Sequence, residues 1–272
     1  MNSSNLDLKR IALVVQYIGT NFHGWQRQPH HRSIQEEIET AIALTLGHDV
    51  TIHGAGRTDS GVHGAAQVAH FDAVSSIPPE RWAKVLNTRL GDDVLIRASA
   101  EVSQDWHACF SALARRYRYT IYTGKIPNLF LKPFTWHYYH HPLDAEIMAE
   151  ALQPLLGTHD FSAFRRAGSP RPHSFLEVQD VSCQRIKDLI HIEIQASGFL
   201  YGMVRLLVGL LVEVGSRVRS PLEFKNIWVN QRRDLVKYSA PAKGLCFLRV
   251  HYPEFPIPES VWYNSQPIFT FS

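Results

Sequence analysis

The sequence predicts an α+β fold made of two tandem modules with the same order of elements. Apolar alternation and helical spacing follow one another as strand, helix, strand, strand, helix, strand in the first half, and the second half repeats that order. This order is typical of the split βαβ, or ferredoxin-like, pattern. At about 150 residues per domain, a chain of 272 residues also favours two modules. We place them at 1–107 and 108–272 and expect a cleft between them.

The first module opens with a strand and a helix. Residues 11–17 (IALVVQY) are apolar and rich in β-branched side chains, as a buried strand requires. Ser33 with Glu36 forms a capping-box pattern, apolar residues then recur on one helical face, and Gly47 ends the segment. The sequence therefore predicts a helix over 34–46.

Two short strands, a helix and a final strand complete the first module. Residues 50–53 (VTIH) and 66–72 (AQVAHFD) indicate the two strands. A helix is predicted from Pro79, where Trp82 and further apolar side chains fall at helical spacing. The segment VLIRASAEV from Val94 returns to strand.

The second module follows the same plan. Residues 115–122 (RRYRYTIY) predict a strand, and Leu143 to Leu156 predict a helix that is entered through Asp144 and closed by Gly157. The remaining elements show clear alternation or helical spacing, and they are strands at 175–186 and 189–196, a helix at 202–214 and a strand from Leu245.

Charge composition gives a first indication of the binding partner. The 28 basic residues divide into 20 Arg and 8 Lys against 25 acidic residues, with a net charge of +3 and a pI near 8.7. Arginine binds phosphate with a planar fork and stacks on bases, so this bias points weakly to nucleic acid.

Cysteine usage and hydropathy indicate the compartment. Three widely spaced cysteines form neither a disulfide framework nor a C-x-x-C metal motif. The longest apolar run, Leu206 to Val212, is far shorter than the roughly 20 residues that span a bilayer. The N-terminus has no signal-peptide pattern. We expect a cytoplasmic protein without a membrane segment.

The segment HGAGRTDSGVHG at 53–64 is the densest unusual stretch of the chain. It does not fit a dinucleotide-binding loop, because Asp59 stands where the third glycine should be and no helix follows. It does not fit a P-loop either, because Val62 replaces the lysine. A long polar hairpin remains possible. Alternatively, the glycines let another molecule approach a carboxylate flanked by Arg57.

A family resemblance extends over nearly the whole chain. GAGRTDSGVHG, YIGTNFHGWQRQ, SIQEE, AQVAHFD, DWHACFSALARRYRYTIY, GTHDFSAF, GFLYGMVRLLVG and APAKGL together resemble the bacterial tRNA pseudouridine synthases of the A type. The resemblance implies a pseudouridine synthase core with a central cleft. It also implies isomerisation of uridines 38, 39 and 40 in the anticodon stem-loop, a homodimer, and no cofactor, metal or protein cofactor.

The resemblance also implies roles for particular residues. Asp59 corresponds to the nucleophile of the family, and Arg205 to the arginine that pairs with it and keeps it ionised. Tyr117 corresponds to the tyrosine that stacks on the target uracil, and Leu245 supplies an apolar wall beside that ring. Arg57 corresponds to the arginine that enters the RNA stem as the target base is flipped out.

Contacts to the rest of the tRNA are expected from basic and aromatic side chains near these blocks. We expect them from Trp106, His107, Phe110, Arg115, Arg165, Arg166 and Arg171. The chain departs from the family at Cys109, where an arginine is usual, and at Tyr201-Gly202, where a bulkier polar pair is common. One tRNA contact is therefore lost or moved.

Two other functions are alternatives to the isomerase. A non-catalytic tRNA-binding or chaperone protein would use the same basic residues without needing Asp59. A sugar hydrolase would need two carboxylates at one bond, and only Asp72 lies near the loop as a second one. Fifteen histidines occur without a metal-binding pattern such as H-E-x-x-H, so we expect no metal site.

Overall fold

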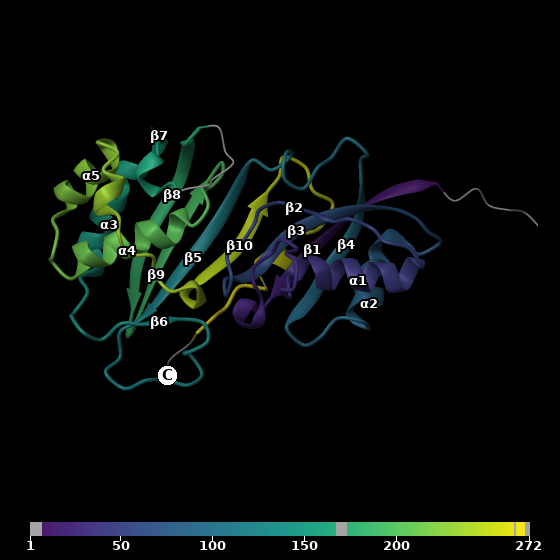
Figure 1. Cartoon of the computed structure of the whole chain (residues 1–272), viewed down its shortest axis with the longest axis horizontal. Helices are drawn as coiled ribbons and strands as arrows, with labels where there is room; N and C mark the ends of the chain where they lie inside the picture. The colour runs from purple at the N-terminus through teal and green to yellow at the C-terminus, as the bar shows by residue number, and fades with distance from the viewer. Residues whose placement is uncertain (1–6, 167–172, 264, 270–272) are drawn as a thin grey trace, which may run out of the picture. The chain divides into compact units, whose positions relative to one another are not determined.

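The computed structural model describes residues 7–166, 173–263 and 265–269. The chain forms two compact units, one of Met1–Leu113 with Phe247–Phe269 and one mainly of Ala114–Cys246. The sequence places a single division after residue 107, whereas here the chain returns to the first unit near its end. Figure 1 labels the elements of both units.

The first unit is an antiparallel sheet in the order β4-β1-β3, with β2 and β10 also beside β3. Its elements are β1 (Leu8–Tyr17), α1 (Ile34–Leu46), β2 (His53–Gly54), β3 (His63–Val74), α2 (Trp82–Asn87), β4 (Val94–Val102), β10 (Leu245–His251) and α6 (Ser260–Tyr263). Figure 1 shows α1 and α2 side by side. Buried side chains such as Ile38 on α1 and Trp82 on α2 form one core with Leu13 of β1 and Phe71 of β3.

The predicted helix over 34–46 is confirmed at both ends. The Ser33 hydroxyl accepts a hydrogen bond from the Glu36 amide, and Gly47 has a φ of 79°, which favours glycine. The strand predicted at 50–53 is wrong in its extent, since only His53 and Gly54 pair with β3. The Ile52 amide instead donates to the buried Glu39 carboxylate, which holds this segment against α1.

The strands of the second unit lie in the order β5-β9-β8-β7, all antiparallel, and β6 runs parallel to β5. Its elements are β5 (Ala114–Tyr122), β6 (Trp136–His137), α3 (Ala145–Leu152), β7 (Gly157–Asp160), β8 (Phe175–Ile186), β9 (Leu189–Ala196), α4 (Met203–Gly215) and α5 (Pro221–Val229). α3 packs against β8 and against α4 and α5. The chain as a whole has an α+β fold with a mixed sheet.

Several short 3₁₀ turns connect these elements. They are Gly19–Asn21, Pro79–Arg81, Gln153–Leu155, Ser162–Phe164, Arg233–Leu235 and Ala242–Gly244. The helix predicted over Leu143–Leu156 is shorter, because α3 ends at Leu152 and passes into one of these turns at Pro154. Asp144 accepts hydrogen bonds from the Glu146 and Ile147 amides at 3.2 Å and begins the helix.

Among the residues that the structure describes, no helix is long and apolar enough to cross a membrane. α4, which carries the longest apolar run of the sequence, is 13 residues long.

Candidate active site

Asp59 lies in the loop between β2 and β3, in the first unit. The loop is closed at its base by a hydrogen bond from the Ala55 amide to the Val68 carbonyl and by one from the Gln67 side chain to the Gly56 carbonyl, at 2.8 and 2.7 Å. Asp59 is partly exposed, whereas Thr58 before it is buried. Asp59 is therefore in contact with solvent, while the residue before it is anchored in the interior of the unit.

A tight turn follows the aspartate directly. The Val62 amide donates to the Asp59 carbonyl at 3.2 Å, and Gly61 has a φ of 77°. A positive φ at the third position of a four-residue turn is the reason that glycine stands there. The turn fixes the main chain on the C-terminal side of Asp59.

The segment 22–25 supports this turn from a distant part of the sequence. The Trp25 amide donates to the Thr58 carbonyl at 3.1 Å. The Phe22 carbonyl accepts from the Gly61 amide at 3.1 Å and from the Ser60 hydroxyl at 3.2 Å. Main-chain or side-chain bonds thus hold the residues on both sides of Asp59.

Glycine is required at position 24 for two reasons. Its φ is 92°, and a Cβ there would collide with the Thr58 carbonyl oxygen. The close approach of the two segments therefore depends on Gly24. Gly24 lies within the motif YIGTNFHGWQRQ, and its contact with the loop is what this motif contributes to the site.

The structure gives two loop glycines a role that differs from the one inferred from sequence. A Cβ on Gly54 would meet the Trp25 indole, and a Cβ on Gly64 would meet the Tyr17 ring. These glycines admit side chains of the same chain rather than another molecule. His63, whose Nδ1 accepts from the Gly19 amide at 3.1 Å, is likewise buried within the first unit.

Arg205 lies on α4 in the second unit, among buried apolar neighbours. Its Nε donates to the Ala240 carbonyl at 2.7 Å, and the Ala240 amide donates to the Arg205 carbonyl at 2.9 Å. The predicted pairing of Arg205 with Asp59 joins residues of different units and stays a prediction. Within its own unit, the side chain is oriented by its hydrogen bond to the Ala240 carbonyl.

The residues that follow Ala240 bind one tyrosine of β5 and lead into β10. Tyr119 is fully buried and donates to the Pro241 carbonyl at 2.8 Å, so it is a core tyrosine, as strand alternation allowed. Tyr117 is 7% exposed and meets the Phe199 ring edge-on at 4.9 Å. Leu245 is buried at the start of β10.

The arginines of β5 make contacts within the second unit. Arg115 is buried and donates to the Ser197 carbonyl at 2.8 Å. On the opposite face of the strand, Arg116 and Arg118 both bind the Glu193 carboxylate, each at 2.6 Å. Burial alone would raise the pKa of Glu193, but the two arginines hold it below its usual value. This face of the sheet thus carries an internal charge network.

Arg165 and Arg166 end the described stretch before residue 167. The Arg166 guanidinium donates to the Ser239 hydroxyl at 2.9 Å and lies 5.4 Å from the centre of the Tyr201 ring. The Arg165 carbonyl accepts from the Arg233 Nε at 3.1 Å. Arg171 lies outside the described residues.

Trp106, His107 and Phe110 lie together in the first unit. Trp106 packs against Tyr252 at 4.9 Å between ring centres. The His107 Nδ1 accepts from the Phe110 amide at 3.3 Å, and the Phe110 ring stacks on His107 at 4.3 Å while 84% exposed. An exposed aromatic ring with a rigid neighbour is a suitable surface for stacking on a base.

Two further histidines extend this stack. His53 of β2 stacks on His70 of β3 at 5.1 Å, and His107 meets His70 edge-on at 4.6 Å. Burial, with smaller contributions from His107 and Arg10, lowers the pKa of His70 to about 4. Burial also lowers the pKa of His107. Cross-strand pairing of β2 with β3 brings His53 and His70 together, and no local pattern marks it.

Asp72 does not serve as a second catalytic carboxylate. Arg10 binds it with two hydrogen bonds, from Nε at 2.7 Å and from Nη2 at 2.8 Å. The hydrogen bond from Arg10 holds the pKa of Asp72 below its ordinary value. An ionised, doubly bonded carboxylate is a poor general acid, which removes the support for a sugar hydrolase.

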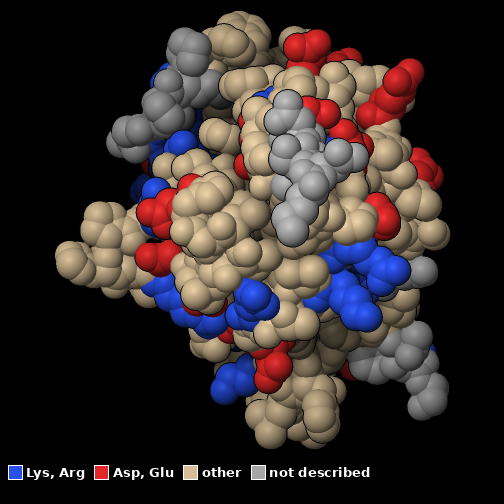
Figure 2. All heavy atoms as spheres, turned by 90° about the vertical axis from the view of Figure 1, so that its right-hand side faces the viewer, with Lys and Arg blue, Asp and Glu red and all other residues tan. Residues whose placement is uncertain are grey.

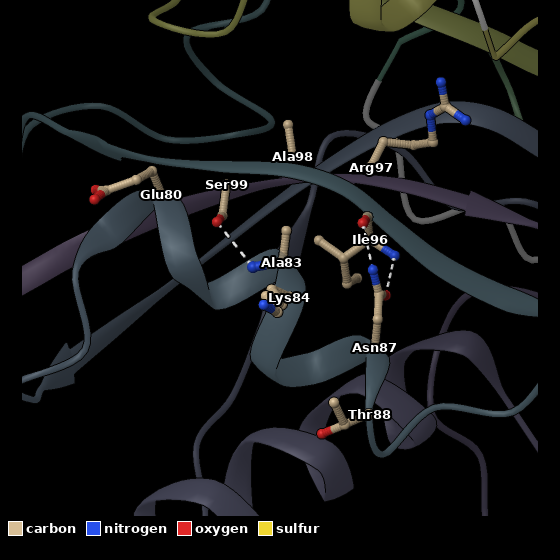
Figure 3. A pocket seen from close by; sticks show the side chains of 9 residues that line it. All are labelled: Glu80, Ala83, Lys84, Asn87, Thr88, Ile96, Arg97, Ala98 and Ser99. Carbon is tan, nitrogen blue, oxygen red and sulfur yellow. Dashed lines mark hydrogen bonds between the residues drawn. The ribbon is translucent and has the colours of Figure 1, made fainter.

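A hollow of about 620 Å³ lies elsewhere in the first unit, between α2 and β4. Figure 3 shows the Asn87 side chain pairing with the main chain of Ile96, and Ser99 accepting from the Ala83 amide. None of the residues that line this hollow was predicted to act in the site. The hollow instead borders the outer edge of the sheet.

Charge on the face drawn in Figure 2 is mixed. Basic side chains gather in its middle and acidic side chains mostly in its upper part. Within the described ranges, no group of three or more His, Cys, Asp or Glu side chains is arranged to hold a metal ion.

Comparison with known proteins shows the family to which the chain is similar. The family model described as tRNA pseudouridine synthase matches residues 13–111 and 151–253. A tRNA pseudouridine synthase A of Rippkaea orientalis is 64% identical over 264 residues, which cover 97% of this chain and 90% of the relative. The protein of the same description from a Synechocystis species is 61% identical over 272 residues, which cover 100% and 99%.

A solved structure is also similar, but only weakly. A chain from the crystal structure of a Cbf5-Nop10-Gar1 complex matches with a TM-score of 0.29 and 13% identity. The match covers 74% of this chain and 54% of that one. A likeness at this level carries no argument about the site.

Proposed function

Because this chain belongs to the tRNA pseudouridine synthase family and isomerises uridines 38, 39 and 40 of tRNA to pseudouridine, we propose that Asp59 is the nucleophile of that reaction. The proposal rests on the hydrogen bonds that hold the loop around Asp59. Asp59 borders solvent in a turn whose neighbours on both sides are bonded to the segment 22–25. Such a carboxylate is held ready for a substrate before the substrate arrives.

The reaction is an isomerisation whose atoms and electrons balance within the uridine. The N1–C1′ bond breaks, a C5–C1′ bond forms, and a proton moves from C5 to N1. A carboxylate either adds to C1′ or assists removal of the C2′ proton as a glycal forms. Both routes require Asp59 in its ionised form, and neither requires a cofactor or a metal.

We propose that Arg205, Tyr117 and Leu245 complete the site, as the family resemblance implies. Arg205 pairs with Asp59 and stabilises its charge, Tyr117 stacks on the uracil ring, and Leu245 contacts that ring from the side. The hydrogen bond from the Arg205 Nε to the Ala240 carbonyl supports the first role, because it fixes the direction of the side chain.

We further propose that tRNA is held by Trp106, His107, Phe110, Arg115, Arg165, Arg166 and Arg171, with Arg57 entering the stem as the base is flipped out. The exposed Phe110 ring on His107 supports the aromatic part of this surface. Arg115 is buried and bonded to Ser197, so its contact with a phosphate would require that bond to be exchanged.

The finer architecture and the assembly are also proposals. The strand order β4-β1-β3-β2 of the first unit supports a ferredoxin-like module, and we propose a second such module and a central cleft. We propose a cytoplasmic homodimer, as the family resemblance implies. Light scattering of the purified protein measures the dimer, and a monomeric mass at working concentration would contradict it.

The nucleophile is tested with Asp59→Asn. The variant is expected to fold and to bind tRNA but to form no pseudouridine, because an amide neither adds to C1′ nor accepts a proton. Pseudouridine is mapped at single-nucleotide resolution in unmodified tRNA after incubation with the protein.

Asp72→Asn is the matched control, because it removes an ionised carboxylate of the same unit that is bonded to Arg10. It is expected to retain activity. Substantial product from Asp59→Asn would reject the nucleophile and favour a role for other groups. If Asp72→Asn formed no product while Asp59→Asn did, Asp72 rather than Asp59 would be the carboxylate that the reaction requires.

A further inference from the structure

Thr58, next to Asp59, is bonded to a tyrosine that comes from another part of the chain. The Oη atom of Tyr17, the last residue of β1, lies 2.9 Å from the Thr58 Oγ1. Tyr17 is 3% exposed and Thr58 is 7% exposed. The hydrogen bond is therefore shielded from water, which strengthens it.

The main chain alone does not explain this hydroxyl pair. The Thr58 carbonyl is already bonded to the Trp25 amide, so the backbone position of Thr58 has its own support. The hydroxyl bond adds a second constraint, on the side chain and hence on rotation of the chain at Thr58. Asp59 is the next residue, and its direction depends on that rotation.

The ring of Tyr17 has a separate role in the core. It belongs to the core cluster of the first unit, lies 6.1 Å from the Trp25 ring and packs on the main chain at Gly64. A phenylalanine would make these ring contacts equally well. The hydroxyl is thus the part of Tyr17 that packing does not require.

We infer that Tyr17 and Thr58 are positioning residues whose buried hydroxyl pair directs the Asp59 carboxylate toward the ribose. The inference rests on the proposed role of Asp59 as nucleophile. A reacting group displaced by about 1 Å can lose a hundredfold in rate, so a bond one residue from the carboxylate has a measurable effect on the chemical step.

The test uses Tyr17→Phe, Thr58→Val and the conservative Thr58→Ser in the full chain. Single-turnover rate, tRNA dissociation constant and unfolding midpoint are measured on the same preparations. Tyr17→Phe and Thr58→Val are each expected to slow the single turnover by roughly tenfold or more, with the dissociation constant changed by less than about twofold. Thr58→Ser keeps a hydroxyl and is expected to restore most of the rate.

Tyr17→Phe combined with Thr58→Val provides a second measurement. If the two hydroxyls act only through their mutual bond, the double variant is no slower than the slower single variant. Rate losses that multiply would show that each hydroxyl acts independently, and would overturn the inference.

Tyr122→Phe is the matched control. Tyr122 is 8% exposed, and its hydroxyl donates to the Ile126 carbonyl at 2.9 Å in the second unit. Its loss is expected to lower the unfolding midpoint without slowing the reaction. If Tyr122→Phe slowed the reaction as much as Tyr17→Phe, the slowing would be explained by lost stability alone. Equal slowing by Thr58→Ser and Thr58→Val would show that the hydroxyl is not needed. Either result would overturn the inference.

The two proposals fail in different ways. A normal rate in Tyr17→Phe, together with an inactive Asp59→Asn, overturns the positioning role and leaves the nucleophile in place. An active Asp59→Asn removes the proposed function itself, whatever the Tyr17 variants do.

Discussion

Arg57 is exposed at the protein surface, two residues before the partly exposed Asp59 in the same loop. Thr58 between them is fixed by bonds to Tyr17 and Trp25. A side chain on this rigid support can act on the RNA during base flipping rather than in the initial docking. Arg165 and Arg166 lie in a different loop, in the second unit.

We therefore expect Arg57→Ala to slow the single turnover strongly while costing little tRNA affinity. Arg165→Ala and Arg166→Ala are the comparison, and each phosphate contact that they remove is expected to reduce the log–log salt slope of binding by about 0.7 to 0.9. Binding and rate are measured over a salt series on one tRNA. Equal losses of binding and rate in Arg57→Ala would make it a docking residue like the others.

His70 links the stability of the first unit to pH. Its pKa is lowered to about 4 by burial, whereas a histidine in the unfolded chain titrates near 6.5. Since the unfolded state binds the proton more readily, stability is fully present above about pH 6.5 and is lost as pH falls toward 4. The loss that His70 accounts for is at most about 3 kcal/mol by pH 4.

Chemical denaturation at pH 7.5 and at pH 4.5 measures this loss. His70→Asn keeps an acceptor for the Ala108 amide and is expected to show a smaller decrease between the two pH values than the wild type. His48→Asn removes an exposed histidine and is expected to leave the decrease unchanged. His191 of β9, with a pKa also lowered to about 4 by burial, remains in both variants. An unchanged decrease in His70→Asn would show that His70 is not the group that titrates.

Helices and strands differ in how far their limits can be predicted from the sequence. α1 is predicted residue by residue, because its cap at Ser33 and its stop at Gly47 are local. The strand at 50–53 is overestimated, because its backbone partner is a buried carboxylate on α1 rather than a neighbouring strand. α5 was missed, although Ser220 and Glu223 carry a capping box as plain as that of α1.

Prediction from the sequence is more limited for the candidate site than for the helices and strands. The sequence identifies Asp59 through its family motif, but the support from Tyr17, Phe22 and Trp25 involves contacts between residues 33 to 41 positions apart. No periodic pattern records which carbonyl a distant amide will reach. Sequence can therefore name the reactive group here, while the structure is needed to show what holds its loop.

The capping box of α5 gives an element-level prediction. The Ser220 hydroxyl accepts from the Glu223 amide at 3.2 Å, and the Glu223 carboxylate accepts from the Ser220 amide at 2.8 Å. Ser220→Ala is expected to lower the free energy of unfolding by about 1 kcal/mol. Ser76→Ala, in an exposed bend, is the control and is expected to be neutral. Equal unfolding curves for both variants would show that the cap contributes nothing.

For the whole molecule, the chemistry predicts independence from metal ions. The isomerisation needs a carboxylate and a flipped base, and neither step calls for an electrophilic cation. Enzyme treated with EDTA and then supplied with magnesium for tRNA folding is expected to keep its rate. Loss of the rate, followed by recovery with zinc, would contradict this prediction.

The return of the chain to the first unit at Phe247 has a consequence during synthesis on the ribosome. β3 and the loop that carries Asp59 leave the exit tunnel early, but the part of β10 that lies beside β3 follows only after about 170 further residues. At translation rates of about 5 to 20 residues per second, that interval is on the order of ten seconds. Throughout it the nascent chain presents an unpaired strand edge, which is a site for wrong pairing. The nascent first unit is therefore expected to need protection, for instance from a chaperone, until translation ends.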